Sequence, residues 1–437
     1  MNASTKSSQQ TAARRASGRR VIFDVAIAGG GLAGAALAVA CAKAGLSVAL
    51  VEPRAPDAGE GKAEGRQAGG PERVIALSRG SRDYLDELGA WAAIEREGAE
   101  PIREVHVLEP GLPPRVRMRE RDAGVDALGY VAGNESILRA LYAAMPDAVT
   151  LRSPARVEAV EPGEDAVRLT VRRLGRGGRP SHLSCRLLVA ADGTESRVRA
   201  MCGIRSQGWD HNRFGIVASV RPRLPHQGVA WECFRPAGPL AFLPLDAARL
   251  SIVWTLPPRR AAEVMAMNDA DFLRALERDA GEAMARRLGG LLETGPQAAF
   301  PFEFRLAARL TAPRVALIGN AAHTLHPVAG QGLNLGLRDV AVLADALARA
   351  RAAGRDVGAP IVLEEYSQRR WPDDVAVAAF TEGLNAVFAN DLLPLKLARG
   401  AGLACMQALP PLKAWLMRRA TGLAQAPALA ARAGKGA

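Results

Sequence analysis

The stretch "VAIAGGGLAGAALA" (residues 25–38) decides the fold of this chain. Its apolar beginning predicts a buried strand, and its small residues predict a helix over residues 32–44. Three glycines with the spacing G-x-G-x-x-G stand where the strand meets the helix. Gly29 permits a tight turn, Gly31 lets the backbone approach a pyrophosphate, and Gly34 lets the helix pack closely on the sheet. The beginning of the chain is therefore predicted to bind a dinucleotide.

The next strand, predicted over residues 46–51, supports the same interpretation because it ends at an acidic residue. Glu52 follows Gly34 at the spacing of roughly 20 residues found in dinucleotide sites, where a carboxylate accepts hydrogen bonds from ribose hydroxyls. A carboxylate there would repel a 2′-phosphate, so NADP is disfavoured at this site. FAD and NAD both remain open on these residues alone.

The composition is that of an ordinary globular protein with more than one domain. The chain has 437 residues, of which 49% are hydrophobic and 23% are charged, and this length predicts about three domain-sized units. No apolar run approaches the roughly 20 residues that a membrane-spanning helix needs. The five cysteines are scattered without a C-x-x-C motif, so we expect no disulfide framework and a reducing compartment.

The net charge of +12 comes from the two ends of the chain. Residues 1–20 carry five basic side chains, residues 392–437 carry seven, and neither segment has an acidic residue. Because the body between them is neutral, we expect no nucleic-acid partner, which would more often need a basic groove in the folded body. Basic ends fit contact with an anionic membrane surface or an acidic partner, or they are simply solvated tails.

The first 20 residues contain no apolar segment of a secretory signal, although their Ser/Thr/Arg-rich, acid-free composition also fits an organelle transit segment. We therefore expect a cytoplasmic protein, with a peripheral position on the inner membrane as the alternative that the basic ends suggest.

Short apolar runs bounded by proline and glycine predict an antiparallel sheet between residues 212 and 256. Residues 261–291 are predicted to be helical, and everything from Val340 on is predicted to be helix broken at Pro372, Pro394, Pro410 and Pro411. Residues 53–72 predict a mobile loop. The expected division is a disordered basic tail at 1–20, a nucleotide domain at 21–100, 131–205 and 306–372, a substrate domain at 101–130 and 206–305, and a helical C-terminal region with a basic tail at 373–437.

Two later strand ends also carry glycine motifs. Asp192-Gly193 ends an apolar run and precedes Arg197 and Arg199, which either meet the phosphates of a nicotinamide cofactor or are solvated. The stretch "GNAAHTLHPVAGQGLNLG" (residues 319–336) connects a predicted strand to a predicted helix. Its amides at the helix start favour a bound negative charge, and its glycines allow a planar group to approach.

In their order and spacing, these motifs resemble the single-component FAD-dependent aromatic hydroxylases, over about residues 21–390. The resemblance implies an α/β chain with the fold of p-hydroxybenzoate hydroxylase. That fold has a discontinuous Rossmann-type FAD domain, an antiparallel β-sheet substrate domain and a helical C-terminal region. It also implies FAD as the cofactor, NAD(P)H as a co-substrate and O2 as the source of the transferred oxygen.

The same resemblance implies where FAD binds. The first glycine motif would hold its ADP half, Asp192-Gly193 is linked to FAD and NAD(P)H, and Gly319-Asn320 stands where the family has Gly-Asp for the ribityl chain. Asparagine can still donate and accept hydrogen bonds there. The residues expected to bind the cofactor are Gly29, Gly31, Leu32, Ala33, Gly34, Glu52, Pro53, Arg54, Arg73, Asn134, Val157, Asp192, Gly193, Gly319, Asn320, Pro327, Gly330, Gly332, Leu333 and Asn334.

Longer segments resemble one subgroup, the ubiquinone-biosynthesis hydroxylases. They are "RVIALSRGSRDYLDELGAW" (73–91), "GPLAFLPL" (238–245), "YSQRRWPDD" (366–374) and "FAN" (388–390). The subgroup implies a polyprenylated phenol as substrate, with 2-polyprenyl-6-methoxyphenol as the first choice, and a ubiquinone-biosynthesis complex as a partner. A hydroxylase of another ring position, a prenyl-chain reductase and a flavin-binding scaffold remain alternatives.

The remaining candidates are two histidines and a set of apolar strand residues. His323 and His326 are three residues apart in a loop with no clustered Cys, Asp or Glu, so we expect hydrogen bonding within the loop rather than a metal site. No catalytic side chain stands out. The central strands would either line an apolar substrate pocket or form core, and the pocket candidates are Phe234, Phe242, Leu243, Pro244, Leu245 and Trp254.

Overall fold

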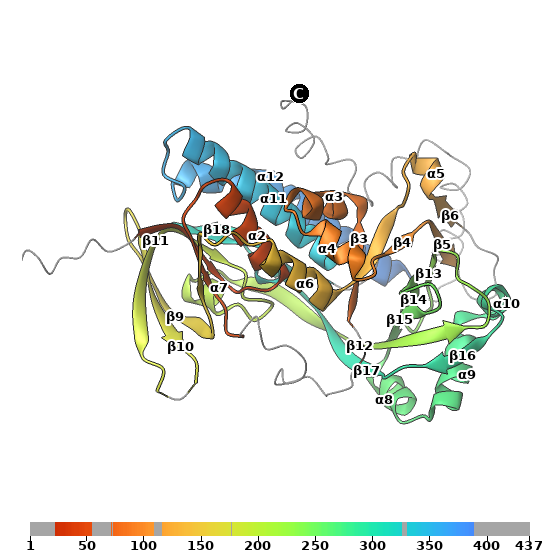
Figure 1. Cartoon of the computed structure of the whole chain (residues 1–437). Helices are drawn as coiled ribbons and strands as arrows, with labels where there is room; N and C mark the ends of the chain where they lie inside the picture. The colour runs from red at the N-terminus through yellow and green to blue at the C-terminus, as the bar shows by residue number, and fades with distance from the viewer. Residues whose placement is uncertain are drawn as a thin grey trace, which may run out of the picture.

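The structure of the chain is a computed structural model that describes residues 22–54, 71, 73–108, 116–175, 177–325 and 330–388. These residues form two bodies joined by the long strands β12 (Ser206–Pro222) and β17 (Ala298–Ala307), as Figure 1 shows. None of the helices in the described part of the chain is long and apolar enough to cross a membrane.

The first body is built on an eight-stranded sheet with a parallel centre. There β1 (Ile22–Ala28) pairs with β2 (Val48–Val51) on one side and with β11 (Pro180–Ala190) on the other. The order β18-β19-β11-β1-β2-β8 brings together segments from distant parts of the chain, and the β9–β10 hairpin extends β11. The other strands are β8 (Val149–Arg152), β9 (Ala155–Pro162), β10 (Val167–Arg173), β18 (Thr311–Ala312) and β19 (Val315–Leu317).

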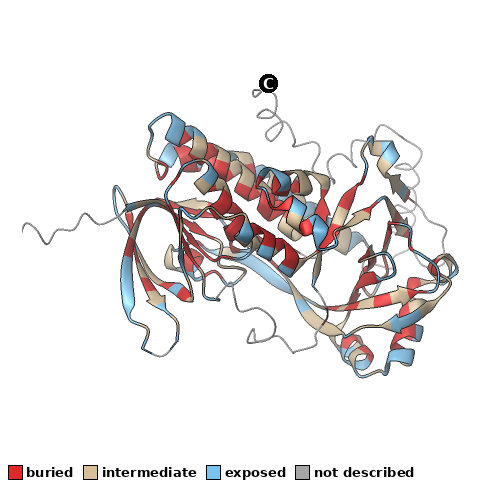
Figure 2. Cartoon of the chain, in the orientation of Figure 1, coloured by how far each residue is buried: buried red, intermediate tan, exposed pale blue. Residues whose placement is uncertain are grey.

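Helices cover this sheet because its central strands are apolar throughout. Val25, Ala26 and Ile27 of β1 are completely buried, as expected for parallel strands that are covered on both faces. The small residues of α2 (Leu32–Lys43) pack against α11 (Gln331–Ala352), which in turn packs against α12 (Pro360–Phe388). Figure 2 shows the buried residues concentrated where these helices meet the sheet.

The second body is a nine-stranded sheet, mostly antiparallel, with the order β20-β17-β12-β15-β14-β13-β5-β6 and with β16 beside β12. Only β5 and β13 pair in parallel among its described strands. The helices α8 (Pro258–Met265), α9 (Asp269–Ala280) and α10 (Glu282–Leu288) pack on one of its faces. Its other strands are β5 (Glu104–Leu108), β6 (Val116–Arg119), β13 (Val229–Cys233), β14 (Leu240–Pro244), β15 (Leu250–Leu256), β16 (Leu291–Thr294) and β20 (His323–Thr324).

A three-stranded sheet joins the two bodies. It consists of β3 (Val74–Ser78), β7 (Gly129–Gly133) and β4 (Glu100–Ile102). Its apolar side chains pack against Ala230 of the second body. The remaining elements are the helices α3 (Arg79–Glu87), α4 (Trp91–Arg96), α5 (Glu120–Ala123), α6 (Asn134–Ala143) and α7 (Arg197–Met201) and the 3₁₀ turn η1 (Gly319–Ala321).

This architecture confirms the predicted α/β class, with a discontinuous Rossmann-type unit and an antiparallel sheet. The predicted strand, helix and strand at the start of the chain are β1, α2 and β2. The strand predicted before residue 319 is β19, which pairs in parallel with β11 although more than 100 residues separate them. The parallel sheet therefore brings the ends of β1, β11 and β19 to one edge.

The expected helix break at Pro372 is wrong, because α12 continues through this residue. Proline removes one backbone donor and crowds the preceding turn, so contacts outside the helix must hold it together. Arg370 lies just before Pro372 and binds Asp339 of α11, whereas Asp373 just after it binds Arg338 of α11. Two ion pairs therefore fasten α12 to α11 on both sides of the proline.

The single helical segment expected over residues 261–291 is also wrong. It consists of α8, α9 and α10, and Leu291 already belongs to β16. Asn268 caps α9 by accepting a hydrogen bond from the Asp271 amide, which fixes a new helix start. Gly281 then separates α9 from α10. The apolar residues follow a helical period throughout, so their pattern did not reveal these two interruptions.

Candidate functional site

Three segments that follow β1, β11 and β19 meet at one edge of the parallel sheet. In the first segment, Gly29 has φ +102°, and a Cβ there would collide with the carbonyl of Ala191 in the second segment. A Cβ on Gly34 would collide with the carbonyl of Gly29. Both glycines are therefore required by packing, as predicted from their spacing.

Three other glycines have open space beside them. Nothing lies within 4 Å of the position that a Cβ would take at Gly31, Gly193 or Gly332. One of these glycines belongs to each of the three converging segments. This is the room that a cofactor needs to approach the backbone closely, so the residues present fit a bound dinucleotide.

Glu52 fixes the first glycine turn. One oxygen of its carboxylate accepts the amide hydrogen of Gly30 at 2.5 Å, and the other accepts that of Arg54 at 2.8 Å. Each carboxylate oxygen keeps a further lone pair, so ribose hydroxyls can still donate to it. Pro53 and Arg54 are exposed beyond the end of β2, and Leu32 and Ala33 are half-buried at the start of α2.

Tyr142 of α6 also holds this turn, and the sequence analysis missed it. Its hydroxyl donates a hydrogen bond of 3.0 Å to the carbonyl of Gly30. Burial and then the charge of Glu52 raise the pKa of this hydroxyl, so it remains protonated and keeps donating. No local pattern in the sequence connects Tyr142 with a residue 112 positions away.

Asp192 organises the second segment. Its carboxylate accepts hydrogen bonds from the Ser196 hydroxyl at 2.5 Å and from the Val198 amide at 3.1 Å, which fixes the start of α7. These two hydrogen bonds fix the turn at Gly193, and the space beside Gly193 stays open. A ligand would therefore meet the main chain of this turn sooner than the Asp192 side chain.

Arg199 has neither of the two roles expected for it. The side chain is buried, and it donates one hydrogen bond to the Ala321 carbonyl at 2.9 Å and another to the Thr194 carbonyl at 2.8 Å. The hydroxyls of Thr194 and Thr324 lie 2.9 Å apart beside it. Arg199 therefore ties the second segment to the third, whereas Arg197 is exposed.

The third segment begins with the turn at Gly319, whose amide donates to Asp339 of α11 at 2.9 Å. A Cβ on Gly319 would lie 3.1 Å from the Cβ of Ala33, so this turn packs on the start of α2. Asn320 next to it is exposed. Pro327 and His326 lie outside the described residues, and the description resumes at Gly330.

Asn334 fastens the start of α11 to β3. Its side-chain oxygen accepts the Ser78 amide hydrogen at 2.8 Å, and its side-chain nitrogen donates to the carbonyls of Ala76 at 2.9 Å and Gly330 at 2.7 Å. The Asn334 side chain is buried, and both its oxygen and its nitrogen are hydrogen-bonded to main-chain groups. Any contact of Asn334 or the half-buried Leu333 with a ligand would therefore come from the main chain at the helix start.

Arg73 and Asn134 are neighbours, since the Asn134 amide donates to the Arg73 carbonyl at 2.8 Å. The Arg73 guanidinium lies 4.3 Å from the centre of the Phe300 ring. Asn134 is the first residue of α6, and Gly133 occupies the capping position before it. Val157 is buried in the main core opposite Val171, away from any open surface.

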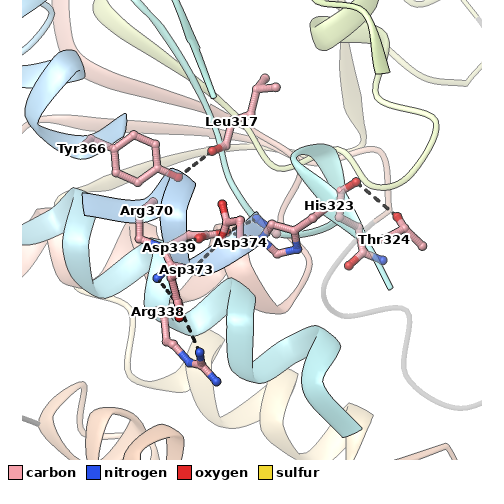
Figure 3. Close-up of polar contacts among 11 residues, drawn as sticks. Leu317, His323, Thr324, Arg338, Asp339, Tyr366, Arg370, Asp373 and Asp374 are labelled. Atoms are coloured by element: carbon pink, nitrogen blue, oxygen red, sulfur yellow. Dashed lines mark hydrogen bonds and ion pairs between the residues drawn. The ribbon is translucent and has the colours of Figure 1, made fainter. Parts of the chain in front are cut away.

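His323 belongs to a buried ionic network, and its hydrogen bond goes to Asp339 of α11 rather than to a residue within the loop, as had been expected. Its Nε2 is 2.7 Å from Asp339 and 4.0 Å from Asp374 (Figure 3). The three possible ligand atoms lie within 4.8 Å of one another. However, Arg370 binds Asp339 at 2.8 Å and Asp374 at 2.5 Å in the same place. A guanidinium that already neutralises both carboxylates favours an ion network over a metal site.

The network perturbs the ionisation of its members. Burial raises the pKa of Asp339, but His323 and Arg370 outweigh this effect and lower it. Burial lowers the pKa of His323, but Asp339 and Asp374 outweigh this effect and raise it. Burial and then the charge of Asp339 raise the pKa of Asp374 to about 7. Because Asp339 also accepts the Gly319 amide, these charges lie directly behind the third segment.

The nine-stranded sheet separates the predicted pocket residues between its two faces. Phe242 and Trp254 are completely buried under α9, where Trp254 packs edge-on against Phe272 and donates to Asp279. They are core residues, so the prediction that they line a pocket is corrected. Pro244 is buried and lies on the same side of β14 as Phe242, whereas Leu243 between them faces the other side.

The opposite face of this sheet is only half-buried, and we call it the open face. A row across six strands, defined by the pairing register, contains one residue from each strand. All six are half-buried, whereas their chain neighbours such as Trp231 and Ile252 are buried in the core. Phe234 packs on this side against Val107 and Leu384. The row is Val107, Glu232, Ala241, Val253, Val217 and Ala298.

Comparisons with known proteins agree with this geometry. A family model described as an FAD binding domain matches residues 23–381. Ubiquinone hydroxylase UbiL of Rhodospirillum rubrum is 36% identical over 92% of this chain and 90% of its own length. The 3-demethoxyubiquinol 3-hydroxylase of Escherichia coli is 32% identical over 92% of this chain and 98% of its own length. The human ubiquinone biosynthesis monooxygenase COQ6 is 31% identical over 91% of this chain and 92% of its own length.

Solved structures extend the comparison to the fold. PqsL, a probable FAD-dependent monooxygenase from Pseudomonas aeruginosa, aligns with a TM-score of 0.70 at 26% identity, over 88% of this chain and 99% of its own. The p-nitrophenol 4-monooxygenase PnpA from Pseudomonas putida has the same TM-score at 20% identity, over 92% of this chain and 97% of its own. The chain therefore belongs to the FAD-dependent monooxygenases, in the group of the ubiquinone-biosynthesis hydroxylases.

Proposed function

We propose that this monooxygenase hydroxylates the aromatic ring of a polyprenylated phenol in ubiquinone biosynthesis, using NAD(P)H and O2. The substrate proposed first is 2-polyprenyl-6-methoxyphenol, which would become the corresponding benzoquinol. The observation that carries the proposal is the position of the open face. Ala230 of this face packs in a cluster with Ala76 of β3. Ala76 in turn contacts Gly330 at the start of α11, where the third glycine segment ends.

FAD would be held by the three converging segments. We assign the pyrophosphate to the open backbone at Gly31 and the start of α2, and the ribose to Glu52. The turns at Gly193 and at Gly319-Asn320 would hold the middle of the cofactor, and the amides around Gly332 would face its ring. When bound, FAD accepts electrons from NAD(P)H and activates O2 for transfer to the ring.

The chain itself would supply a charge environment and a dry surface. The positive end of α11 favours negative charge on a reduced flavin ring. Asn334 and Asp339 hold that end and the Gly319 turn in place from behind. The apolar residues of the open face suit a prenylated ring, since small-molecule sites are lined mainly by such side chains with few polar groups.

Labelled oxygen tests this function. The purified protein, loaded with FAD, is given a short-chain 2-prenyl-6-methoxyphenol, NADH or NADPH, and ¹⁸O2. We expect one labelled oxygen atom in the ring product and substrate-stimulated oxidation of the nicotinamide. Bound FAD without any substrate-stimulated oxidation would instead support a flavin-binding scaffold, and a product with a saturated prenyl chain would support a reductase.

A second ring position is favoured by one observation, the similarity to the 3-demethoxyubiquinol 3-hydroxylase of Escherichia coli. Deletion of the gene in its host separates the positions, because the unused substrate accumulates. Accumulated 2-polyprenyl-6-methoxyphenol supports the first choice. Accumulated 2-polyprenylphenol or a demethoxyquinone supports the alternative.

We also propose that the protein binds a membrane surface from its C-terminal side. In the second half of α12, the large apolar residues Val375, Phe380 and Val387 are exposed. The sequence beyond it, residues 392–437, carries seven basic residues and no acidic one, which suits an anionic surface. Full-length protein should sediment with anionic vesicles and a variant ending at residue 390 should not. Equal sedimentation of both would contradict the proposal.

A further inference from the structure

Glu232 is the acidic member of the open-face row. Its strand neighbours Trp231 and Cys233 point into the core under α9, so alternation along β13 turns the Glu232 side chain to the opposite side. It is flanked by Val107 on β5 and Ala241 on β14. Neither neighbour can pair with a carboxylate.

No described residue forms a hydrogen bond or an ion pair with the Glu232 carboxyl. Burial is the cause that raises its pKa to about 7. A buried carboxyl without a partner costs stability, and natural proteins usually avoid this arrangement unless the group has a use. Glu232 as a whole residue is only partly buried, so its side chain lies at the surface of the open face.

The ionisable groups on the surrounding elements are engaged elsewhere. On β5, Glu104 binds His106, whose ring meets Trp231 on the core side of the sheet. On β13 the nearest group is the Cys233 thiol, whose pKa is raised to about 12 by burial and then by Glu232. Beyond β13, Arg235 binds Asp279 under the sheet.

The other facing elements add no charge to the carboxyl. Neither β14 nor β3 contains an ionisable residue. On β7, Tyr130 packs edge-on against Trp91, and Glu100 is the one ionisable residue of β4. On α12, Glu382 pairs with His211. Glu232 therefore titrates as a single group in an apolar setting.

The open face connects this carboxyl to the cofactor side of the molecule. Ala230, two residues before Glu232 on the same side of β13, packs with Val131 and Ala76 of the joining sheet. A Cβ on Gly330 would lie 3.1 Å from the Cβ of Ala76. A ring placed between the open face and the start of α11 would therefore lie along the face on which Glu232 is the acidic member of the row.

Resting on the proposed function, we propose that Glu232 is the base that accepts the phenol proton of the substrate. The phenol O–H bond breaks, the proton moves to a carboxylate oxygen of Glu232, and the electron pair stays on the phenolate oxygen and is shared with the ring. The ring carbon would then form a bond to one oxygen atom of O2 while the O–O bond breaks. The other oxygen atom leaves as water, with the two electrons that NAD(P)H supplies through FAD. As aromaticity returns, that carbon loses its hydrogen as a proton to water and Glu232 returns its proton to the phenolic oxygen.

Glu232 has both the position and the acidity that a base for a phenol needs. A base works best when its pKa lies near the working pH, because it is then both ionised and able to hold the proton. Once a prenylated ring covers this face, the apolar row beside Glu232 would keep water from competing for the phenol proton. Elsewhere on the sheet the exposed carboxylate Glu293 is paired with Arg221 and lies at the edge, so it serves as a matched control.

The test compares the wild-type holoenzyme with Glu232→Gln, Glu232→Asp and the control Glu293→Gln. Flavin content is measured first, so that loss of FAD is separated from loss of the base. Single-turnover hydroxylation of a short-chain prenylated phenol is then followed from about pH 5.5 to about pH 9. We expect the wild-type and control rates to rise through about pH 7. Glu232→Gln should be slower by about 100-fold or more and lose this inflection.

Two further measurements exclude a merely structural role. A polyfluorinated phenol with one free ring position, which is already ionised at neutral pH, should recover most of the lost rate in Glu232→Gln, and Glu232→Asp should keep the inflection. Bound nitrophenol, followed by absorbance, should ionise at lower pH in Glu232→Gln than in wild type, because the Glu232 carboxylate repels a phenolate.

An unchanged rate and pH profile in Glu232→Gln would overturn the proposal. So would an equal loss in both Glu232 variants that the fluorinated phenol does not recover. If the wild type hydroxylates no phenol at all, the proposed function fails instead. In that case the nitrophenol titration still decides whether Glu232 meets a phenol.

Discussion

Carboxyl groups are buried in two regions of this protein under opposite conditions. Behind the Gly319 turn, Asp339, Asp373 and Asp374 lie among Arg338, Arg370 and His323, and nearly every charge has a partner. On the open face, Glu232 has no partner among the residues that the structure describes. The first arrangement is buried away from solvent, and its ion pairs join α11, α12 and the third glycine segment. The second keeps a proton site accessible.

The difference teaches how buried charge can be assigned to structure or to chemistry. A network whose members neutralise each other holds elements together, and removing one partner leaves the others uncompensated. A carboxyl without a partner joins no elements. Its removal should therefore not lower the stability of the fold and should impair only the reaction.

Arg370→Met should destabilise the protein most, by about 3–5 kcal/mol in the free energy of unfolding, because it leaves buried aspartates without their cation. Urea unfolding of the FAD-free and FAD-loaded protein measures this effect. Arg369→Met is the matched control, since Arg369 is more exposed and binds Asp345 near the surface. Its cost should stay near 1 kcal/mol or below. Similar losses in the two variants would remove the distinction between the network and ordinary surface pairs.

His323→Asn should have a smaller effect that depends on pH. Because the pKa of His323 is raised in the folded protein, its stabilisation is fully present below the unfolded pKa of about 6.5 and is lost as pH rises through the folded pKa. The variant should therefore lose more stability at about pH 6 than at about pH 9, as measured by thermal unfolding. A constant loss over this range would mean that the histidine is not charged in the network.

Glu232→Gln should change stability least and in the opposite direction. Because the folded pKa of Glu232 is raised to about 7 from the ordinary 4.5, burying its charge costs stability as pH rises from the unfolded to the folded pKa. The variant should have a higher Tm than wild type at about pH 8 and a nearly equal Tm at about pH 4. Glu293→Gln should show no such pH-dependent gain. A lower Tm at both pH values would place Glu232 with the structural carboxylates.

Part of the site could be predicted because its determinants are local. Gly29 and Gly34 are required by contacts within a few residues of the first turn and by the neighbouring strand end, so their spacing alone indicated their roles. The late motif around Gly330 and Gly332 was recognisable for the same reason. Tyr142 was missed because its partner Gly30 lies on a different element, far away in the chain.

Other side chains were misjudged because the same residue type serves structure and function. Arg199 follows a glycine turn, as a phosphate ligand would, but its hydrogen bonds join two segments of main chain. Phe242 and Trp254 lie on strands that a substrate could touch, but they face the helices. Alternation predicts that a strand has two faces, and it does not say which face the helices will cover.

By itself, the sequence determined the β1–α2–β2 unit, the antiparallel middle of the chain and the family, since these follow from short-range patterns of glycine, charge and apolar residues. Tertiary contacts were needed to show that Asp339 and Asp374 surround His323, that α12 continues through Pro372, and that no cation of the described residues pairs with Glu232 on the open face. The physical reason is that burial and ion pairing depend on residues brought together from distant parts of the chain. No local pattern records those contacts.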